Sequence, residues 1–314
     1  MFHTEGKMKI LQAITLLMAV SIQTSFAAAP YGGQTMVGDL KKVLVRSPDD
    51  AFGNASPQKW HYTAQPDLAI AKREHQDFVA ILEKEGVQVE YHNTPLPSAD
   101  AIFVHDPAII TDHGAIILRM GKPLRQGEEH AIKKKFQSLN IPILYELTGE
   151  ASAEGGDILW LDDKTLAIGR GFRTNQEGID EIRKALAKFD IQVIQVDLPY
   201  DQGKEACLHL QSLISLVDHK KALVYLNYLP VSFVELLKNK GFTLIEVPTK
   251  EFNSMGSNVL AIKPNVCLTI EGNPETKKRL QAAGCKVYTY KGNEISHKAE
   301  GGATCLTRPL LRLS

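Results

Sequence analysis

The stretch PDLAIAKREHQDFVAILEKEGVQVEY, residues 66–91, decides the fold. Residues 66–85 have the apolar spacing of a helix, Gly86 follows, and residues 87–91 alternate apolar and polar side chains as a half-buried strand does. A glycine at this place tolerates the left-handed conformation in which many helices end. The stretch therefore predicts a helix that leads directly into a strand.

The same helix–strand pattern recurs four more times along the chain, and each predicted helix ends at Gly, Asn or Asp. The four later copies pair residues 126–139 with 141–145, 176–189 with 191–196, 232–240 with 242–247, and 274–283 with 285–290. Short apolar runs that flank turn residues predict hairpins between the copies, at 109–110 with 115–118, 158–161 with 165–168, and 259–262 with 266–270.

The repeating unit is therefore a hairpin, a helix and a strand. Units begin near Ser98, Ala153, Ala206, Met255 and Ala299. This spacing of roughly 45 to 55 residues is longer than that of solenoid repeats and suits a radial array of small sheets. The last unit lacks a helix, and a strand at 42–46 can complete it and close a ring. We expect residues 28–314 to form a single α/β domain of this kind.

Composition narrows the class of partner. The 314 residues include 36 Lys and Arg against 36 Asp and Glu, so the formal net charge of zero offers no field for a polyanion. We therefore expect no nucleic-acid partner. With 44% hydrophobic residues the chain has an ordinary globular composition.

The first 27 residues have the pattern of a secretory signal peptide. Lys7 and Lys9 precede an apolar run at 10–22, and a small-x-small end follows at 25–27. We expect export, to a periplasm or out of the cell, with no membrane partner once the signal is removed. The alternative is a retained N-terminal arm on a cytoplasmic protein.

Unexplained polar residues stand at the start of each hairpin unit. They are Asp100 and Asp106, then Glu154 and Asp157, then His209, then Asn258, and finally Cys305. In a radial array equivalent positions of successive units converge on one axis. A thiol, an imidazole and several carboxylates would then share a central pocket, as a binding or catalytic site requires.

Each of these residues also has a purely structural interpretation. His209 alone can be a core histidine, and Asp106 before Pro107 can start a turn. The glycine pairs at 155–156 and 301–302 can supply turns with positive φ. Equivalent placement in successive units favours the shared pocket over these separate explanations.

Four short motifs carry a resemblance to a known superfamily. FVHDP (103–107), EGGD (154–157), LHL (208–210) and GGATCL (301–306) resemble, in order, the motifs of the guanidine-modifying enzymes, which include arginine deiminases, amidinotransferases and dimethylarginine dimethylaminohydrolases. The resemblance runs from about residue 41 to the end of the chain. It implies the pentein fold, a five-bladed propeller of ββαβ units with pseudo-fivefold symmetry.

Within this superfamily the chain most resembles the dimethylarginine dimethylaminohydrolase branch. That similarity lies in PDLA (66–69), RQGE (125–128), RTN (173–175) and the six-residue step between two of the acidic residues. Gln211 stands where arginine deiminases and amidinotransferases usually carry an acid. His105 stands where the dimethylarginine branch tends to have Glu, which predicts a different pocket near the substrate.

The resemblance implies hydrolysis of a guanidino C–N bond in arginine or methylated arginine. Citrulline and an amine would form through a covalent S-alkylthiouronium intermediate on a cysteine. The implied catalytic residues are Cys305, His209 and Glu154, and the implied substrate-binding residues are Asp106, Asp100, Arg125, Arg173 and Asp157. Of these, we expect Asp106 and Glu154 to accept paired N–H bonds from the guanidinium, and Asp157 to support the pocket wall.

Several alternatives stay open at this point. Arginine deimination with release of ammonia is the second choice, followed by amidinotransfer and by a non-catalytic arginine-binding protein. A cysteine protease is disfavoured because the histidine precedes the cysteine in the chain. We expect no organic cofactor and no metal, since Cys207 and His209 supply at most two ligands. A homodimer is a further open expectation.

The other cysteines carry separate expectations. Cys267 and Cys285 lie in apolar strand-like runs, which favours buried free thiols. Cys207, close to His209 in sequence, is a candidate to pair with Cys305 in an oxidised, inhibited form.

Overall fold

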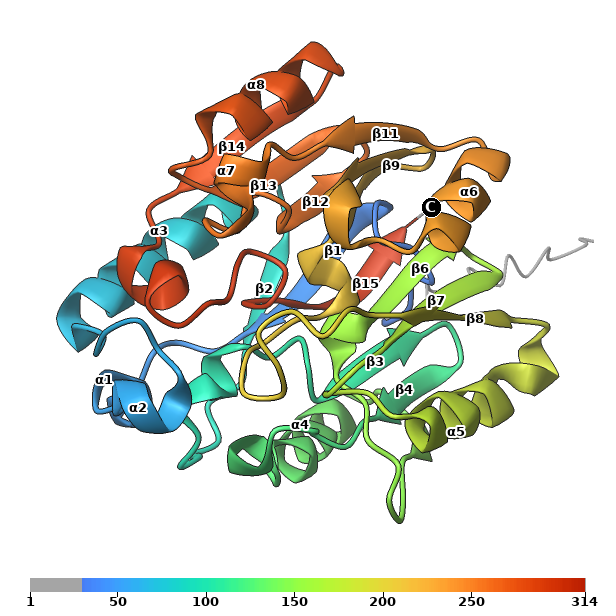
Figure 1. Ribbon diagram of the computed structural model, residues 1–314. Helices are drawn as coiled ribbons and strands as arrows, with labels where there is room; N and C mark the ends of the chain where they lie inside the picture. Colours follow the sequence, from blue (N-terminus) through green and yellow to red (C-terminus); the bar gives the residue numbers. More distant parts are fainter. Residues whose placement is uncertain (1–29, 314) are drawn as a thin grey trace, which may run out of the picture.

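The structure, a computed structural model, describes residues 30–313, in which the strands form five three-stranded sheets (Figure 1). In four of them an antiparallel hairpin is followed by a helix and by a third strand parallel to the hairpin's second strand. These units are β3 (Ala108–Thr111), β4 (Gly114–Ile117), α4 (Glu128–Ser138) and β5 (Ile143–Glu146); β6 (Ile158–Asp162), β7 (Thr165–Arg170), α5 (Gln176–Leu186) and β8 (Gln192–Asp197); β9 (Ile214–Asp218), β10 (Lys221–Val224), α6 (Val231–Asn239) and β11 (Thr243–Glu246); and β12 (Val259–Lys263), β13 (Val266–Ile270), α8 (Pro274–Ala282) and β14 (Lys286–Tyr290).

The fifth sheet joins the two ends of the described chain. Strand β1 (Asp39–Val45) pairs antiparallel with β15 (Arg308–Leu313) and parallel with β2 (Gln88–Tyr91), which follows α3 (Leu68–Lys84). The prediction that an N-terminal strand completes the last unit is therefore confirmed. The predicted signal peptide at 1–27 lies outside the described residues.

The turns between helix and strand have the predicted left-handed conformation in all five units. Positive φ angles occur at Gly86 (83°), Asn140 (57°), Asp190 (58°), Gly241 (81°) and Gly284 (88°). Glycine adopts this region freely, and Asn and Asp tolerate it better than other residues do. The turn residues thus end each helix and direct the chain back along the sheet.

Three four-residue helices were not predicted: α1 (Asp50–Gly53), α2 (Pro57–Trp60) and α7 (Thr249–Phe252). One turn of helix is too short to show a periodic apolar pattern. Local chemistry supports two of them, because Asp49 caps α1 with bonds to two backbone N–H groups and Pro57 opens α2.

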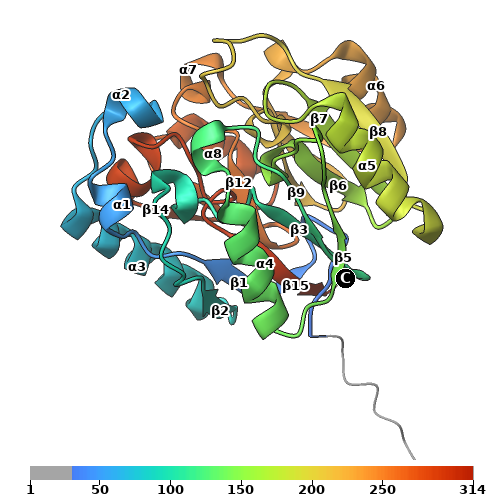
Figure 2. The ribbon, with the colours of Figure 1, turned by 90° about the horizontal axis from the view of Figure 1, so that it is seen from below.

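The sheets lie inside and the helices outside in both views (Figures 1 and 2). Neighbouring sheets touch through inner strands, since β9 contacts β12, β12 contacts β1, and β15 contacts β3. Apolar side chains fill the layer between helix and sheet, as where Ile132 and Phe136 of α4 pack with Ile117 and Leu44. Each such fully buried side chain contributes about 1.5–3 kcal/mol. Within residues 30–313 no helix has the length and apolar character to cross a membrane.

Candidate active site

The predicted polar residues lie in the turns that precede the inner strands. Short 3₁₀ turns at Ala99–Ile102, Gly155–Asp157 and Leu210–Ser212 come shortly before β3, β6 and β9. Six of the eight predicted site residues line one pocket: Asp100, Asp106, Arg125, Arg173, His209 and Cys305. Side chains distant in sequence are thus brought together, as the repeat predicted.

Glu154 lies beneath this pocket, with none of its surface exposed to solvent. Its Oε2 accepts a hydrogen bond from His209 Nε2 at 2.8 Å and a longer one from Arg173 Nη1 at 3.4 Å. Its Oε1 accepts from the backbone N–H of Lys122 at 3.0 Å. Glu154 therefore fixes the orientation of the imidazole and directs one ring nitrogen away from the pocket.

His209 carries a proton in this environment. Burial alone opposes the charge, but Cys207, Asp157 and the hydrogen bond to Glu154 raise the pKa of His209 well above its usual value. Cys207 Sγ lies 3.7 Å from His209 Nδ1. The imidazolium is therefore the form present at neutral pH.

Cys305 is held by an asparagine from the neighbouring unit. Asn258 Nδ2 donates to Cys305 Sγ at 3.3 Å, and Asn258 Oδ1 accepts from the backbone N–H of Thr304 at 3.1 Å. Burial, with the negative charge of Asp106, raises the pKa of the Cys305 thiol to about 11, although His209 acts in the opposite direction. At neutral pH the sulfur is therefore a thiol.

Asp106 and Arg125 form a buried ion pair. Arg125 Nη1 donates to Asp106 Oδ2 at 2.6 Å, and the backbone N–H of Gly156 donates to Oδ1 at 3.0 Å. Burial opposes the charge, but Arg125 and His209 hold the pKa of Asp106 far below its usual range. Arg125 also bonds both oxygens of Glu128 and the carbonyl of Phe103, so one of its five N–H groups is left.

Asp100 has two partners that sequence reasoning missed. Lys122 Nζ donates to its Oδ2 at 2.6 Å, and the hydroxyl of Tyr62 donates to its Oδ1 at 2.7 Å. Lys122 also donates to the carbonyl of Trp60 at 3.0 Å. The sequence offers no signal for these contacts beyond the position of Lys122, three residues before Arg125.

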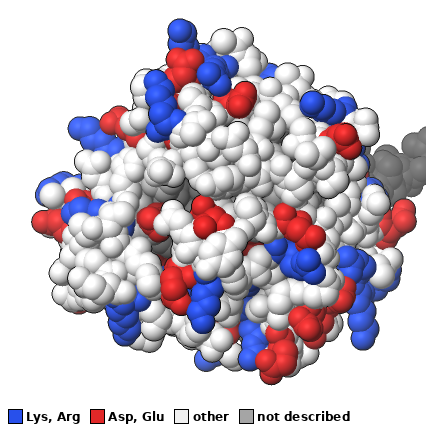
Figure 3. All heavy atoms as spheres, viewed as in Figure 1, with Lys and Arg blue, Asp and Glu red and all other residues white. Residues whose placement is uncertain are grey.

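The pocket has further lining residues to which the sequence analysis assigned no role. They are Trp60, His61, Phe103, Lys122, Glu205, Cys207, Ala299, Glu300 and Gly301. His61 Nε2 lies 3.2 Å from Glu205 Oε2. In Figure 3 acidic side chains lie around the middle of the face seen in Figure 1, and most Lys and Arg lie toward its edge. Negative charge in the middle of this face favours the binding of a cationic ligand.

Asp157, expected among the substrate-binding residues, does not line the pocket. Its Oδ2 accepts from the hydroxyl of Thr174 at 2.6 Å, and its Oδ1 accepts from the backbone N–H of Leu210 at 2.9 Å. Burial raises the pKa of Asp157 to about 6. It holds the turn that carries His209, which agrees with its expected support of the pocket wall.

The motif glycines serve close packing. None of residues 155, 156, 301 and 302 has a positive φ, which argues against the alternative that they only supply left-handed turns. A Cβ on Gly156 would overlap the imidazole of His209, and a Cβ on Gly301 would overlap the ring of Phe103. These positions allow the backbone to approach the side chains of His209 and Phe103 closely.

His105 does not line the pocket, so its predicted effect near the substrate is corrected. Its Nδ1 lies 2.8 Å from the carbonyl of Thr307, and its Nε2 lies 3.1 Å from Gln211 Nε2. Burial lowers the pKa of His105 to about 3, so the ring is neutral. The two residues at which this chain departs from the family patterns therefore contact each other.

The pocket is small as it stands. Its volume is about 40 Å³, and a neighbouring cavity of about 370 Å³ shares with it Cys207, His209, Glu300 and Cys305. A water molecule occupies about 30 Å³ of liquid. The two cavities meet at the thiol and the imidazole, so a ligand in either one reaches both.

The four cysteines are free in the described part of the chain, and Cys267 and Cys285 are buried as expected. The chemistry available at the pocket is that of a buried thiol, an imidazolium and an excess of carboxylates. This set suits attack on a planar cation that can ionise the thiol and bond to the carboxylates.

Comparisons with known proteins agree with this chemistry. The family described as "N,N dimethylarginine dimethylhydrolase, eukaryotic" matches residues 43–312. The chain is 26% identical over 268 residues to the N(G),N(G)-dimethylarginine dimethylaminohydrolase of Pseudomonas aeruginosa, covering 85% of this chain and 98% of that enzyme. It is 27% identical over 271 residues to the arginine deiminase of Borrelia recurrentis, covering 72% of this chain and 64% of that enzyme. The solved structure of DDAH from Pseudomonas aeruginosa, a mutant complexed with citrulline, superposes with a TM-score of 0.72 at 24% identity, covering 86% of this chain and 99% of that one.

Proposed function

The chain belongs to the N,N-dimethylarginine dimethylhydrolase family within the guanidine-modifying superfamily and is a hydrolase of guanidino groups, and on that premise we propose that its substrate is methylated arginine. The products would be citrulline and dimethylamine or methylamine. The observation that carries the proposal is the shared pocket in which Cys305 and His209 lie with Asp100 and Asp106.

Substrate binding prepares the nucleophile. The Cys305 thiol, whose pKa is about 11 in the empty pocket, needs a nearby cation before it ionises. The guanidinium of the substrate supplies that charge, and the thiol proton leaves to solvent. The thiolate then forms a bond from sulfur to the guanidino carbon, and the π electrons of the attacked C=N bond move onto nitrogen.

His209 then moves two protons. The imidazolium donates its proton to the substituted nitrogen, the C–N bond breaks, and the neutral amine leaves an S-alkylthiouronium on Cys305. The neutral imidazole next takes a proton from water as the hydroxide adds to the same carbon. The C–S bond then breaks, its electron pair returns to sulfur, and the proton of the adduct's hydroxyl passes to the sulfur and restores the thiol. One water is consumed, and the released product carries the ureido group of citrulline.

The carboxylates orient the guanidinium. Asp106 accepts one protein hydrogen bond on each oxygen, which leaves lone pairs on both for substrate N–H groups. Glu154 has Oε1 engaged only by the backbone of Lys122. Planar N–H pairs on the guanidinium suit such acceptors, and the low dielectric of a buried site strengthens them.

Arg173 is the better candidate to bind the α-carboxylate of the amino acid. It lines the pocket with 5% of its surface exposed, and its Nε has no hydrogen-bond partner among the described residues. Arg125 has one N–H group left, so its main part would be to orient Asp106. Asp100, held by Lys122 and Tyr62, is the proposed partner of the α-amino group.

Product analysis tests the function. The purified protein is incubated separately with arginine, monomethylarginine and dimethylarginine, and citrulline and the released amine are both identified. We expect citrulline with methylamine or dimethylamine, none from Cys305→Ser, and full activity from Cys285→Ser, whose thiol lies outside the pocket.

Other outcomes point to the alternatives. Citrulline from arginine alone, with ammonia, would replace the proposal by arginine deimination, which the match to arginine deiminases supports as the second choice. A new guanidino product in the presence of an acceptor amine would indicate amidinotransfer. Stabilisation by arginine without any citrulline would indicate a binding protein.

We also propose that the five sheets are the blades of one propeller, the pentein fold. The contacts between β9 and β12, β12 and β1, and β15 and β3 support it, as does the pairing of β1 with β15. The turns before the inner strands would then surround one axis. A crystal structure in which any sheet lies outside the ring would overturn this arrangement.

Export is a separate proposal that rests on residues 1–27. The charged start, apolar run and small-x-small end support cleavage after Ala27. Mass spectrometry of the protein from its native host checks this. A cytoplasmic protein of full length would refute it.

A further inference from the structure

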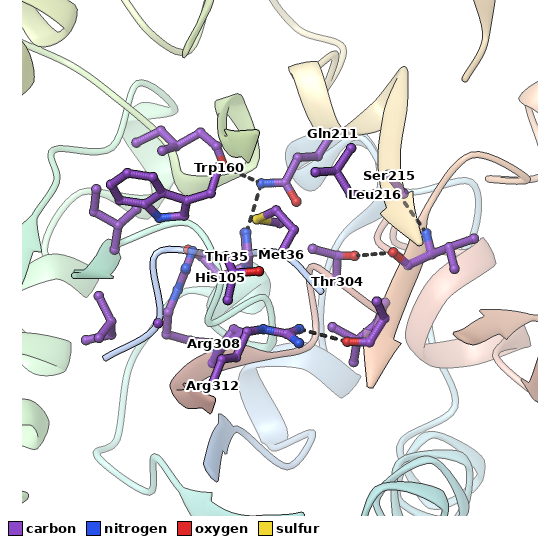
Figure 4. A pocket seen from close by; sticks show the side chains of 18 residues that line it. Thr35, Met36, His105, Trp160, Gln211, Ser215, Leu216, Thr304, Arg308 and Arg312 are labelled. Atoms are coloured by element: carbon purple, nitrogen blue, oxygen red, sulfur yellow. Dashed lines mark hydrogen bonds between the residues drawn. The ribbon is translucent and has the colours of Figure 1, made fainter. Parts of the chain in front are cut away.

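A second cavity lies apart from the catalytic pocket and shares none of its lining residues. Its volume is about 30 Å³, room for one or two water-sized species. Inner strands β6, β9, β12 and β15 contribute to its wall. Figure 4 shows Arg308 and Arg312 together on one side and Trp160 and Gln211 on the other.

The two arginines are buried but bound only to neutral groups. Arg308 and Arg312 are 7% and 4% exposed. Arg308 Nη2 donates to the carbonyl of His105, and the Nη groups of Arg312 donate to the carbonyls of Gly38 and Ala261 at 2.7 and 2.8 Å. The Nε of each arginine is buried and has no hydrogen-bond partner among the described residues.

Among residues 30–313, none that lines this cavity carries a carboxylate. The carboxylates whose charges reach the two guanidiniums are engaged elsewhere, because Asp106 is paired with Arg125 and Asp39 with Lys41. Burial lowers the pKa of both arginines to about 9, so both stay charged at neutral pH. Two like charges close together without a counter-ion are costly to bury.

We infer that this cavity binds one small inorganic anion, of the size of chloride, between Arg308 and Arg312. The unpaired Nε–H groups are donors, the positive charge selects an anion, and the small volume favours a monatomic ion over phosphate or sulfate. The hydroxyls of Ser215 and Thr304 already donate to backbone carbonyls, so the arginines are the main ligands.

The proposed anion site lies outside the catalytic pocket, but it involves the strand that follows the nucleophile Cys305 in the chain. Both arginines lie on β15, the strand that begins three residues after Cys305 and pairs with β1. An anion that binds only the folded state stabilises it by mass action. It would hold the C-terminal strand against the inner strands.

Thermal unfolding of the full chain tests the inference. Melting temperatures are compared in sodium chloride, sodium gluconate and sodium sulfate at equal ionic strength. We expect a saturable rise of several degrees in chloride that gluconate and sulfate do not reproduce. Crystals grown in bromide should show an anomalous peak between Arg308 and Arg312.

Two variants make the test specific. His105→Glu places a carboxylate among the lining residues and should abolish the chloride response while the protein stays folded in gluconate. In Arg312→Met, the chloride concentration needed for the same rise in melting temperature should increase at least tenfold. A response unchanged in both variants, or no bromide peak in the cavity, would overturn the inference.

Discussion

At the scale of single residues, the contact between Glu154 and His209 controls the charge of the imidazole. The 2.8 Å hydrogen bond contributes to the raised pKa of His209, which supports its proposed part as the acid that protonates the leaving amine. The thiol lacks comparable support, since Asn258 is its only side-chain hydrogen-bond partner among the described residues. The substrate must therefore complete the charge balance of the site.

Glu154→Gln tests this pairing. Losing the carboxylate should lower the pKa of His209, so the alkaline limb of the kcat profile moves to lower pH by about one unit or more. We also expect kcat at neutral pH to fall by about 10²-fold. The measurement is citrulline formation across pH, with the exposed Glu246→Gln as control. An unchanged alkaline limb would show that Glu154 does not raise the pKa of His209.

Other site residues could be predicted to very different degrees. Cys305, His209 and Asp106 were found because each lies in a short motif at an equivalent place in its unit. Lys122 and Tyr62 could not be found, because their contacts with Asp100 join segments with no shared pattern. The motif glycines were located from the sequence, but the close packing that excludes a Cβ there depends on neighbouring side chains and could not be predicted.

At the scale of elements, the five left-handed turns define where each helix ends. Gly241 has a φ of 81°, and a Cβ there would meet nothing within 4 Å. The cost of a side chain at this position is therefore conformational and local.

Gly241→Ala should lower the free energy of unfolding by about 1 kcal/mol and leave activity unchanged. Asp190→Gly, at a turn with a φ of 58°, should act in the opposite direction because glycine relieves the strain. Urea unfolding measures both. A loss of activity in Gly241→Ala, or destabilisation by Asp190→Gly, would contradict this account of the turns.

At the scale of the whole molecule, buried neutral histidines link stability to pH. Burial, the largest cause in each case, lowers the pKa of His75 and His92 to about 4 and that of His105 to about 3. Below a pH of about 6.5 the unfolded chain takes up protons at these residues and the folded chain does not. His209 has the opposite sign, because its raised pKa contributes stability that is lost as pH rises through the folded value.

We therefore expect the free energy of unfolding to fall as pH decreases from about 6.5 toward 4, by up to roughly 1.4 kcal/mol per pH unit for each of these histidines. Urea unfolding at a series of pH values measures the slope. His75→Leu should reduce the slope by the contribution of about one proton, because one titrating group is removed. The variant should stay folded, since His75 Nε2 has no hydrogen bond to lose. An unchanged slope in this variant would show that His75 is not buried as a neutral ring.

The sequence by itself determined the repeating unit, the left-handed turns and the identity of the thiol, imidazole and main carboxylates. Those features depend on local spacing and residue type, which a chain carries before it folds. The tertiary structure alone decided that Asp157 supports His209 from behind, that Arg125 is occupied by Asp106 and Glu128, and that two arginines of the last strand share a cavity without a carboxylate. Such facts depend on which side chains from different sheets meet across the interior, and the energy of a buried charge depends on those neighbours.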